Sequence, residues 1–151
     1  MTPRSSTNER RQREPVFFVD QNLRGQFPSY LRLSGLKVEE LEDHFPANAP
    51  DVEWIPFVGE RGWVAITMDY LRGDVEEYAA LMAHGVKVFV IVGKGTHRQR
   101  ADFFIKKIRW VRQTITQHGD HPFVARMSLA SGNHSLTTFE DFLHKRKQRW
   151  R

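Results

Sequence analysis

The stretch Val16-Phe17-Phe18-Val19-Asp20-Gln21-Asn22 joins a continuous apolar run to an aspartate and, two positions later, to an asparagine. Four consecutive apolar residues of this kind are typical of a strand that is buried on both faces of a sheet. An aspartate directly after a strand is a common turn residue. It can also place a carboxylate at the sheet edge where ligands bind in α/β proteins. The stretch therefore predicts a buried strand and leaves two roles open for Asp20.

Strand-like and helix-like segments alternate along the chain outside this stretch. Further strands are expected over residues 36–41, 63–67, 86–92 and 122–127, the last at an edge of the sheet. Helices are expected over about 27–34, 51–60, 74–84 and 97–118, with a short terminal helix from about Thr137. This alternation predicts an α/β fold of three layers, in which helices cover both faces of a mostly parallel sheet of about five strands.

The length of 151 residues and the 40% hydrophobic content predict one folded domain. We expect a disordered basic arm over 1–14, the domain over 15–128, and an extension with a short helix and a basic tail over 129–151. The absence of cysteine excludes disulfides, thiolate zinc sites and cysteine nucleophiles. No apolar run has the roughly 20 residues that a membrane span needs, and the first residues lack the apolar region of a signal peptide. The expectation is a cytoplasmic protein without a membrane partner.

The charges are distributed unevenly along the sequence. Residues 15–80 contain five Lys/Arg and twelve Asp/Glu, whereas residues 81–143 contain nine Lys/Arg and four Asp/Glu. The last eight residues, HKRKQRWR, add five basic side chains and no acid. The excess of carboxylates in the first half is compatible with a cation site. The basic half and tail are compatible with a polyanionic partner.

Three aspartates are placed where a metal site could form. Asp20 and Asp69 follow predicted strands, and Asp51 precedes a predicted helix between them. Carboxylates that gather at one sheet edge repel one another, and a bound cation relieves this repulsion. With no cysteine in the chain, an oxygen-rich site favours Mg²⁺ or Mn²⁺. Turn formation or helix capping is an alternative explanation for each aspartate, most simply for Asp51 and for Asp74.

Three motifs carry a family resemblance: F-V-D-x-N ending at Asn22, H-F-P…A-P-D-x-E-W ending at Trp54, and G-W-V-x-I-T-x-D ending at Asp69. In this order and spacing they resemble the PIN-like ribonuclease domains, and more closely the bacterial branch grouped with VapC-type toxins of toxin–antitoxin pairs. The resemblance covers about residues 15–128. It implies a PIN-like fold and an endoribonuclease that depends on Mg²⁺ or Mn²⁺. It also implies an RNA substrate and a small antitoxin partner, and a homodimer is one expected assembly.

The resemblance implies a role for individual residues of this sequence. Asp20, Asp51 and Asp69 would be the catalytic and metal-binding acids, with Glu53 a substitute for Asp51 and Asp74 a looser fourth acid. Asn22 and Thr67 would orient these ligands. Four residues that follow the strand over 86–92 are expected to hold RNA phosphates, with help from the amides of the helix that begins there: Lys94, His97, Arg98 and Arg100. The sequence differs from the family pattern after Thr67. The family commonly has a basic residue between the threonine and the aspartate and further basic residues after them, whereas this chain has only Arg72.

Two other functions are compatible with parts of this pattern. A non-catalytic PIN-like module that binds RNA or protein would explain the basic tails and the changed surroundings of Asp69. A phosphoacceptor receiver domain also places aspartates at strand ends, but it requires paired acids after the first strand and a lysine later than Lys94. The proximity of Asp20, Asp51 and Asp69 in the folded chain is therefore the feature that separates these interpretations.

Overall fold

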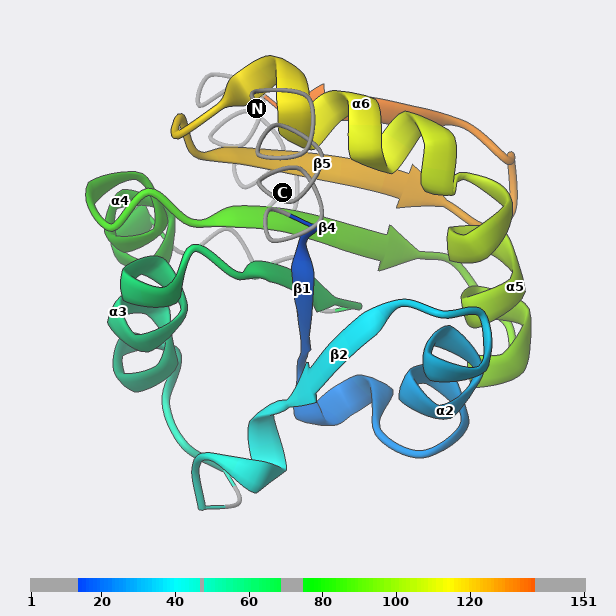
Figure 1. Ribbon diagram of the computed structural model, residues 1–151, viewed down its shortest axis with the longest axis horizontal. Helices are drawn as coiled ribbons and strands as arrows, with labels where there is room; N and C mark the ends of the chain where they lie inside the picture. Colours follow the sequence, from blue (N-terminus) through cyan, green and yellow to red (C-terminus); the bar gives the residue numbers. More distant parts are fainter. Residues whose placement is uncertain (1–13, 47, 69–74, 138–151) are drawn as a thin grey trace, which may run out of the picture.

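The computed structural model describes residues 14–46, 48–68 and 75–137. Within these ranges the protein has one sheet of six strands, in the order β2-β1-β3-β4-β5-β6 (Figure 1). The strands span Val16–Val19 (β1), Lys37–Glu40 (β2), Val64–Thr67 (β3), Lys87–Val92 (β4), Phe123–Ser128 (β5) and His134–Thr137 (β6). The first five are parallel to one another, and β6 runs antiparallel to β5. The predicted fold class is confirmed.

Helices lie on both faces of this sheet. They span Gln26–Leu33 (α2), Asp51–Arg61 (α3), Val75–Ala83 (α4), His97–Lys106 (α5) and Ile108–His118 (α6). Two short 3₁₀ helices, Gln21–Leu23 (η1) and Leu41–Asp43 (η2), follow β1 and β2. Gly35 and Gly62, just past α2 and α3, have φ values of 89° and 67°, and a residue with a side chain rarely adopts such angles.

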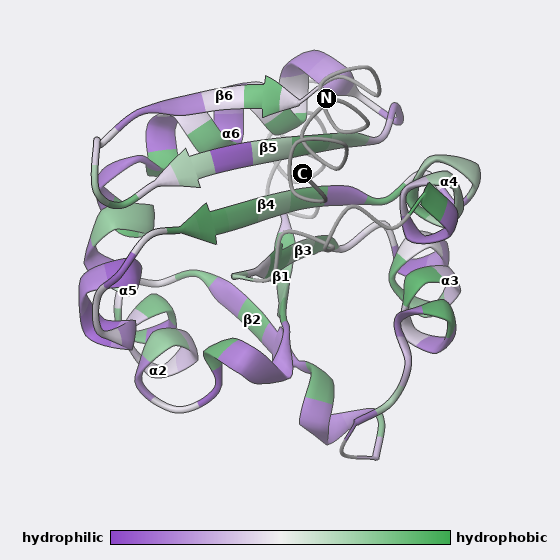
Figure 2. Ribbon diagram, turned by 180° about the vertical axis from the view of Figure 1, so that it is seen from behind, coloured by the Kyte–Doolittle hydropathy of each residue, from purple (hydrophilic) through white to green (hydrophobic). Residues whose placement is uncertain are grey.

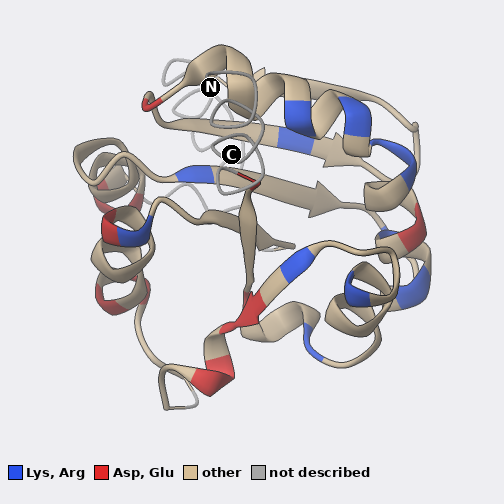
Figure 3. Ribbon diagram, in the orientation of Figure 1, with Lys and Arg blue, Asp and Glu red and all other residues tan. Residues whose placement is uncertain are grey.

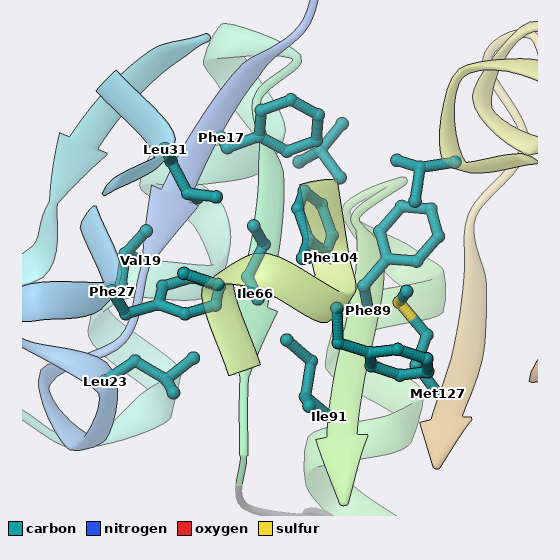
Figure 4. Close-up of a cluster of buried hydrophobic side chains, with 14 of the residues drawn as sticks. Phe17, Val19, Leu23, Phe27, Leu31, Ile66, Phe89, Ile91, Phe104 and Met127 are labelled. Carbon is teal, nitrogen blue, oxygen red and sulfur yellow. The ribbon is translucent and has the colours of Figure 1, made fainter. Parts of the chain in front are cut away.

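The strands alternate their buried side chains between two cores. Phe17, Ile66 and Phe89 belong to the core under α2, α5 and α6, part of which is shown in Figure 4. Phe18 and Val88, each next to one of those residues in sequence, belong to the core under α3 and α4. Because both faces of the central strands are covered, β1 is apolar throughout and β4 is apolar from Val88 to Val92, after Lys87 at its start (Figure 2).

The structure corrects the predicted position of the last strands. Residues 122–127 were expected to form an edge strand, but β5 is paired with β4 on one side and with β6 on the other. The sixth strand was not predicted, because HSLT contains a single apolar residue and no apolar alternation. Thr137, which was expected to begin a terminal helix, is instead the last residue of β6. Pairing with β5 defines this short strand, and the turn before it includes Gly132 with φ of 74°.

The single helix predicted over 97–118 is two helices in the structure. Lys107 has φ of −93° and ψ of 8°, and it separates α5 from α6. The two helices then take different directions: α5 lies beside α2 near the carboxyl ends of the strands, and α6 runs along β5 (Figure 1). The apolar stripe of Phe104, Ile108 and Val111 continues through the break, which is why its periodicity alone predicted one helix. Pro56 lies inside α3 without ending it.

No helix in the described ranges is both long enough and apolar enough to cross a bilayer.

Candidate metal centre and nucleic-acid interface

Asp20 lies at the carboxyl end of β1 and uses both carboxylate oxygens. Its Oδ1 accepts a hydrogen bond from the backbone N–H of Gln21 at 2.7 Å, so the side chain caps η1. Its Oδ2 accepts a hydrogen bond from the Thr67 hydroxyl at 2.8 Å. The backbone N–H of Asp20 donates to the carbonyl of Ile66 in the neighbouring strand. Asp20 is therefore a turn residue whose carboxylate is also held in place from β3.

Asn22 and Thr67 complete a network around this carboxylate. The Asn22 amide donates to the Thr67 hydroxyl oxygen at 3.2 Å, and its carbonyl oxygen accepts from the backbone N–H of Met68 at 3.4 Å. Thr67 is only 2% exposed, so its hydroxyl has a defined position. The chain of bonds from Asn22 through Thr67 to Asp20 joins β1 to β3 at the carboxyl edge of the sheet.

Asp51 is the first residue of α3, but it does not cap the helix. Pro50 occupies the N-cap position, where no side chain makes a capping bond. The Asp51 Oδ1 instead accepts from the indole N–H of Trp54 at 2.6 Å, one turn further along the helix. Trp54 is 2% exposed and packs in the core under α3. The capping alternative for Asp51 is therefore wrong, because its carboxylate is held by a buried indole.

Asp20 and Asp51 line the same surface hollow although 30 residues separate them in sequence. The hollow has a volume of about 710 Å³ and is lined by Asp20, Gln21, Asn22, Arg24, Asp51 and His97. It opens beyond the carboxyl ends of the strands, where ligands bind in parallel sheets. Glu53 is exposed in the first turn of α3 and does not line the hollow.

Two of the predicted acids, Asp69 and Asp74, lie outside the described residues. The described ranges include Met68, one residue before Asp69, and Val75, one residue after Asp74. Among the residues that are described, no three His, Asp or Glu side chains form a group that could hold a metal ion. The described part of the hollow therefore contributes two carboxylates. Thr67, the last residue of β3, is two positions before Asp69 in the sequence.

His97 reaches the hollow from the beginning of α5. Its Nδ1 lies 3.2 Å from a guanidinium nitrogen of Arg100, which can only donate, so Nδ1 accepts and the ring proton is on Nε2. Burial lowers the pKa of His97, and the positive charge of Arg100 lowers it further. The ring is thus neutral near pH 7 and carries one N–H donor.

The other three predicted RNA-binding residues have different environments. Arg100 is 8% exposed, and its guanidinium also donates to the carbonyl of Gly93 at 3.2 Å, so it lies within the fold rather than open to solvent. The Arg98 guanidinium lies 5.3 Å from the ring centroid of Tyr30. Lys94 is exposed in the turn after β4. The Thr96–Gln99 capping box predicted for this helix is present.

Two residues of the hollow were not predicted from the sequence. The side-chain carbonyl of Gln21 accepts from the backbone N–H of Asn48, which connects η1 to the loop before α3. Arg24 is an exposed cation beside the two aspartates. Their closeness to Asp20 in sequence was the available signal, because a 3₁₀ turn after the strand keeps its residues near the sheet edge.

Comparison with known proteins agrees with this geometry. A family model described as "PIN like domain" matches residues 15–93, slightly more than half of the chain. The matched segment runs from β1 to the end of β4 and contains Asp20, Asn22, Asp51 and Thr67. No curated protein matches the chain, and no solved structure matches it.

Proposed function

Because the chain belongs to the PIN-like domain family, we propose that it is a metal-dependent endoribonuclease that hydrolyses RNA phosphodiester bonds. PIN-like domains are commonly nucleases. The observation that carries the proposal is the shared hollow of Asp20 and Asp51, with Thr67 holding the first carboxylate two residues before Asp69. The match also favours this family over a phosphoacceptor receiver domain.

The donor atoms around the hollow suit Mg²⁺ or Mn²⁺. Carboxylate oxygens and an amide oxygen are hard ligands, and the chain has no cysteine to favour a softer metal. We propose that Asp20, Asp51 and Asp69 hold the ion, with Glu53 and Asp74 as alternative acids. When bound, such an ion lowers the pKa of water and stabilises negative charge on a phosphoryl group.

The chain's own residues would orient the substrate and these ligands. Thr67 and Asn22 hold the Asp20 carboxylate in one direction, as polar neighbours of ligands do in metal sites. The Nε2–H of His97 and the guanidinium of Arg24 can donate to phosphate oxygens that enter the hollow. Lys94, in the turn after β4, and Arg98, in the first turn of α5, add positive charge nearby. Arg100 would act through His97, whose ring it positions.

A narrower proposal is that the protein is the VapC-like toxin of a type II toxin–antitoxin pair, with a small antitoxin protein as its partner. Its support is the motif resemblance through Asp69. A small DNA-binding protein encoded beside this chain, which forms a complex with it and suppresses cleavage, is the expected finding. If no such protein is encoded next to this chain, the toxin role is contradicted, but the nuclease proposal is unaffected.

The nuclease proposal is tested with purified full-length protein and labelled single-stranded RNA. Cleavage should require Mg²⁺ or Mn²⁺, stop in EDTA, and be lost in Asp20→Asn and in Asp69→Asn. Asp43→Asn, which removes an exposed carboxylate outside the hollow, is the matched control and should cleave normally. Mn²⁺ should raise the melting temperature of the wild type, because an ion that binds only the folded state stabilises it. This rise should be absent in Asp20→Asn, which lacks one of the proposed ligands. Cleavage at the wild-type rate in both Asp20→Asn and Asp69→Asn would refute the proposed site.

A second candidate function is a non-catalytic PIN-like module that binds RNA or protein. It is favoured by the bond that the Asp51 carboxylate already makes to the Trp54 indole. This function predicts equal RNA affinity with and without Mn²⁺, and no cleavage under either condition. A metal-dependent cleavage activity that Asp20→Asn abolishes would exclude it.

A further inference from the structure

A second polar pocket lies at the opposite end of α5 from the acidic hollow. It has a volume of about 490 Å³, and its lining includes two cations, a histidine and three small polar side chains: Lys107, Arg126, His134, Ser131, Asn133 and Ser135. It contains no acidic residue. All of these residues lie beyond residue 93, where the family match ends. The pocket is thus a feature of this chain's C-terminal part.

The two cations of this pocket are not neutralised by the described part of the protein. Ion pairs among the described residues involve Arg32, His44 and Arg61, and none involves Lys107 or Arg126. Figure 3 shows positive charge on α5, α6 and β5 and negative charge on α3 and around β2. Two cations that share a pocket without a counter-ion repel each other, and a bound anion relieves this repulsion.

His134 provides a neutral polar group in the same pocket. Its ring packs against Trp110 with centroids 3.9 Å apart and an interplanar angle of 31°, and its Nδ1 is buried without a hydrogen-bond partner in the described structure. Burial lowers the pKa of His134, and the charge of Lys107 lowers it further, so the ring is neutral near pH 7. A buried N–H without an acceptor is costly, which favours a proton on Nε2.

The pocket and the acidic hollow lie at opposite ends of α5. His97 at the start of α5 lines the hollow, and Lys107 directly after α5 lines the pocket. Ten helical residues separate the two ends by ~15 Å. The carboxyl ends of β1 and β5 are three strand spacings apart, which also gives ~14 Å. At ~3.4 Å per stacked nucleotide, this distance corresponds to about four nucleotides of a single strand.

We propose that the pocket of Lys107, Arg126 and His134 binds a backbone phosphate of single-stranded RNA, up to about four nucleotides from the bond in the acidic hollow. As a statement about the substrate, this rests on the proposed nuclease function. The RNA would lie along α5. The two cations pair with the phosphate, and the serine hydroxyls and the Asn133 amide can donate to its oxygens.

The test measures binding of a fluorescent 12-nucleotide single-stranded RNA to the full-length protein in EDTA, where metal-dependent cleavage cannot consume the probe. Lys107→Gln combined with Arg126→Gln should lower the affinity about tenfold, as expected for loss of a charge-assisted contact. The slope of log affinity against log salt should fall by about 0.7, the value for one phosphate on a single strand. Arg109→Gln combined with Arg112→Gln removes the same charge from exposed positions of α6 outside the pocket and should have little effect. Equal losses in both double variants, or no loss in the first, would overturn the inference.

An NMR titration of the wild type with inorganic phosphate does not depend on any variant being folded. The His134 ring and the amides of residues 131–135 should shift with phosphate, and not with sodium chloride at equal ionic strength. Absence of phosphate-specific shifts there would also overturn the inference. The outcomes for the two sites are separable. If the wild type cleaves RNA and the pocket variant binds RNA as tightly as the wild type, only the pocket proposal is refuted. If RNA binding depends on the pocket but no cleavage occurs, only the nuclease proposal is refuted.

Discussion

Substitution of Thr67 by valine should uncouple β3 from the Asp20 carboxylate. Valine keeps the shape and the β-branching of threonine, so it suits a buried strand position and removes only the hydroxyl. The substitution removes at least two hydrogen bonds between described residues, one to the Asp20 carboxylate at 2.8 Å and one from Asn22 at 3.2 Å. Because water still reaches the half-buried Asp20, we expect a loss of about 1.5 kcal/mol in the free energy of unfolding. That corresponds to a fall in melting temperature of about 3–6 °C.

A double-mutant cycle separates this hydrogen bond from other effects of the substitution. Urea unfolding in EDTA is measured for the wild type, Thr67→Val, Asp20→Ala and the combined variant. The coupling free energy should be about 1–2 kcal/mol, because removal of Asp20 already abolishes the bond that valine removes. Thr67→Ser keeps the hydroxyl and loses a buried methyl group, so it should destabilise the protein without coupling to Asp20→Ala. Thr67→Val and Asp20→Ala effects that add within about 0.5 kcal/mol would refute the reasoning.

Two further predictions concern helix packing and the His97 ring. Gly59→Ala should lower the free energy of unfolding by about 1–3 kcal/mol although alanine favours helices, because the added Cβ would overlap the backbone carbonyl of His84 at the end of α4; an unchanged urea midpoint would contradict this packing. In Arg100→Met, the pKa of His97 measured by NMR should rise toward 6.5, since the nearby positive charge is gone while burial remains. In the wild type the lowered pKa makes folding least favourable in acid. The contribution of the neutral His97 ring to the free energy of unfolding is fully present above pH 6.5, and it is lost as the pH falls from there through the folded-state pKa. A His97 pKa that is equal in the wild type and in Arg100→Met would contradict the assigned contact.

Local signals in the sequence were sufficient for most of the architecture. The apolar runs over 16–19 and 88–92 predicted buried strands, because a strand covered on both faces must be apolar at successive positions. The Thr96–Gln99 box and the glycines after α2 and α3 predicted helix ends, since capping depends on residues only a few positions apart. The break at Lys107 and the strand β6 were not predictable in this way, because neither interrupts or creates a strong local pattern.

The sequence by itself determined which side chains stand at strand ends, and therefore that Asp20 and Thr67 would meet at one edge of the sheet. The order and register of the strands then bring the two side chains into contact: the Thr67 hydroxyl donates a hydrogen bond of 2.8 Å to Asp20, which is 47 positions away in the sequence. Only the tertiary structure decided the role of Asp51, whose carboxylate is held by the Trp54 indole instead of capping α3. It also brought Lys107, Arg126 and His134 into one pocket. Such groupings depend on where helices pack and where a hairpin closes, and those distances are not encoded in any short stretch of the chain.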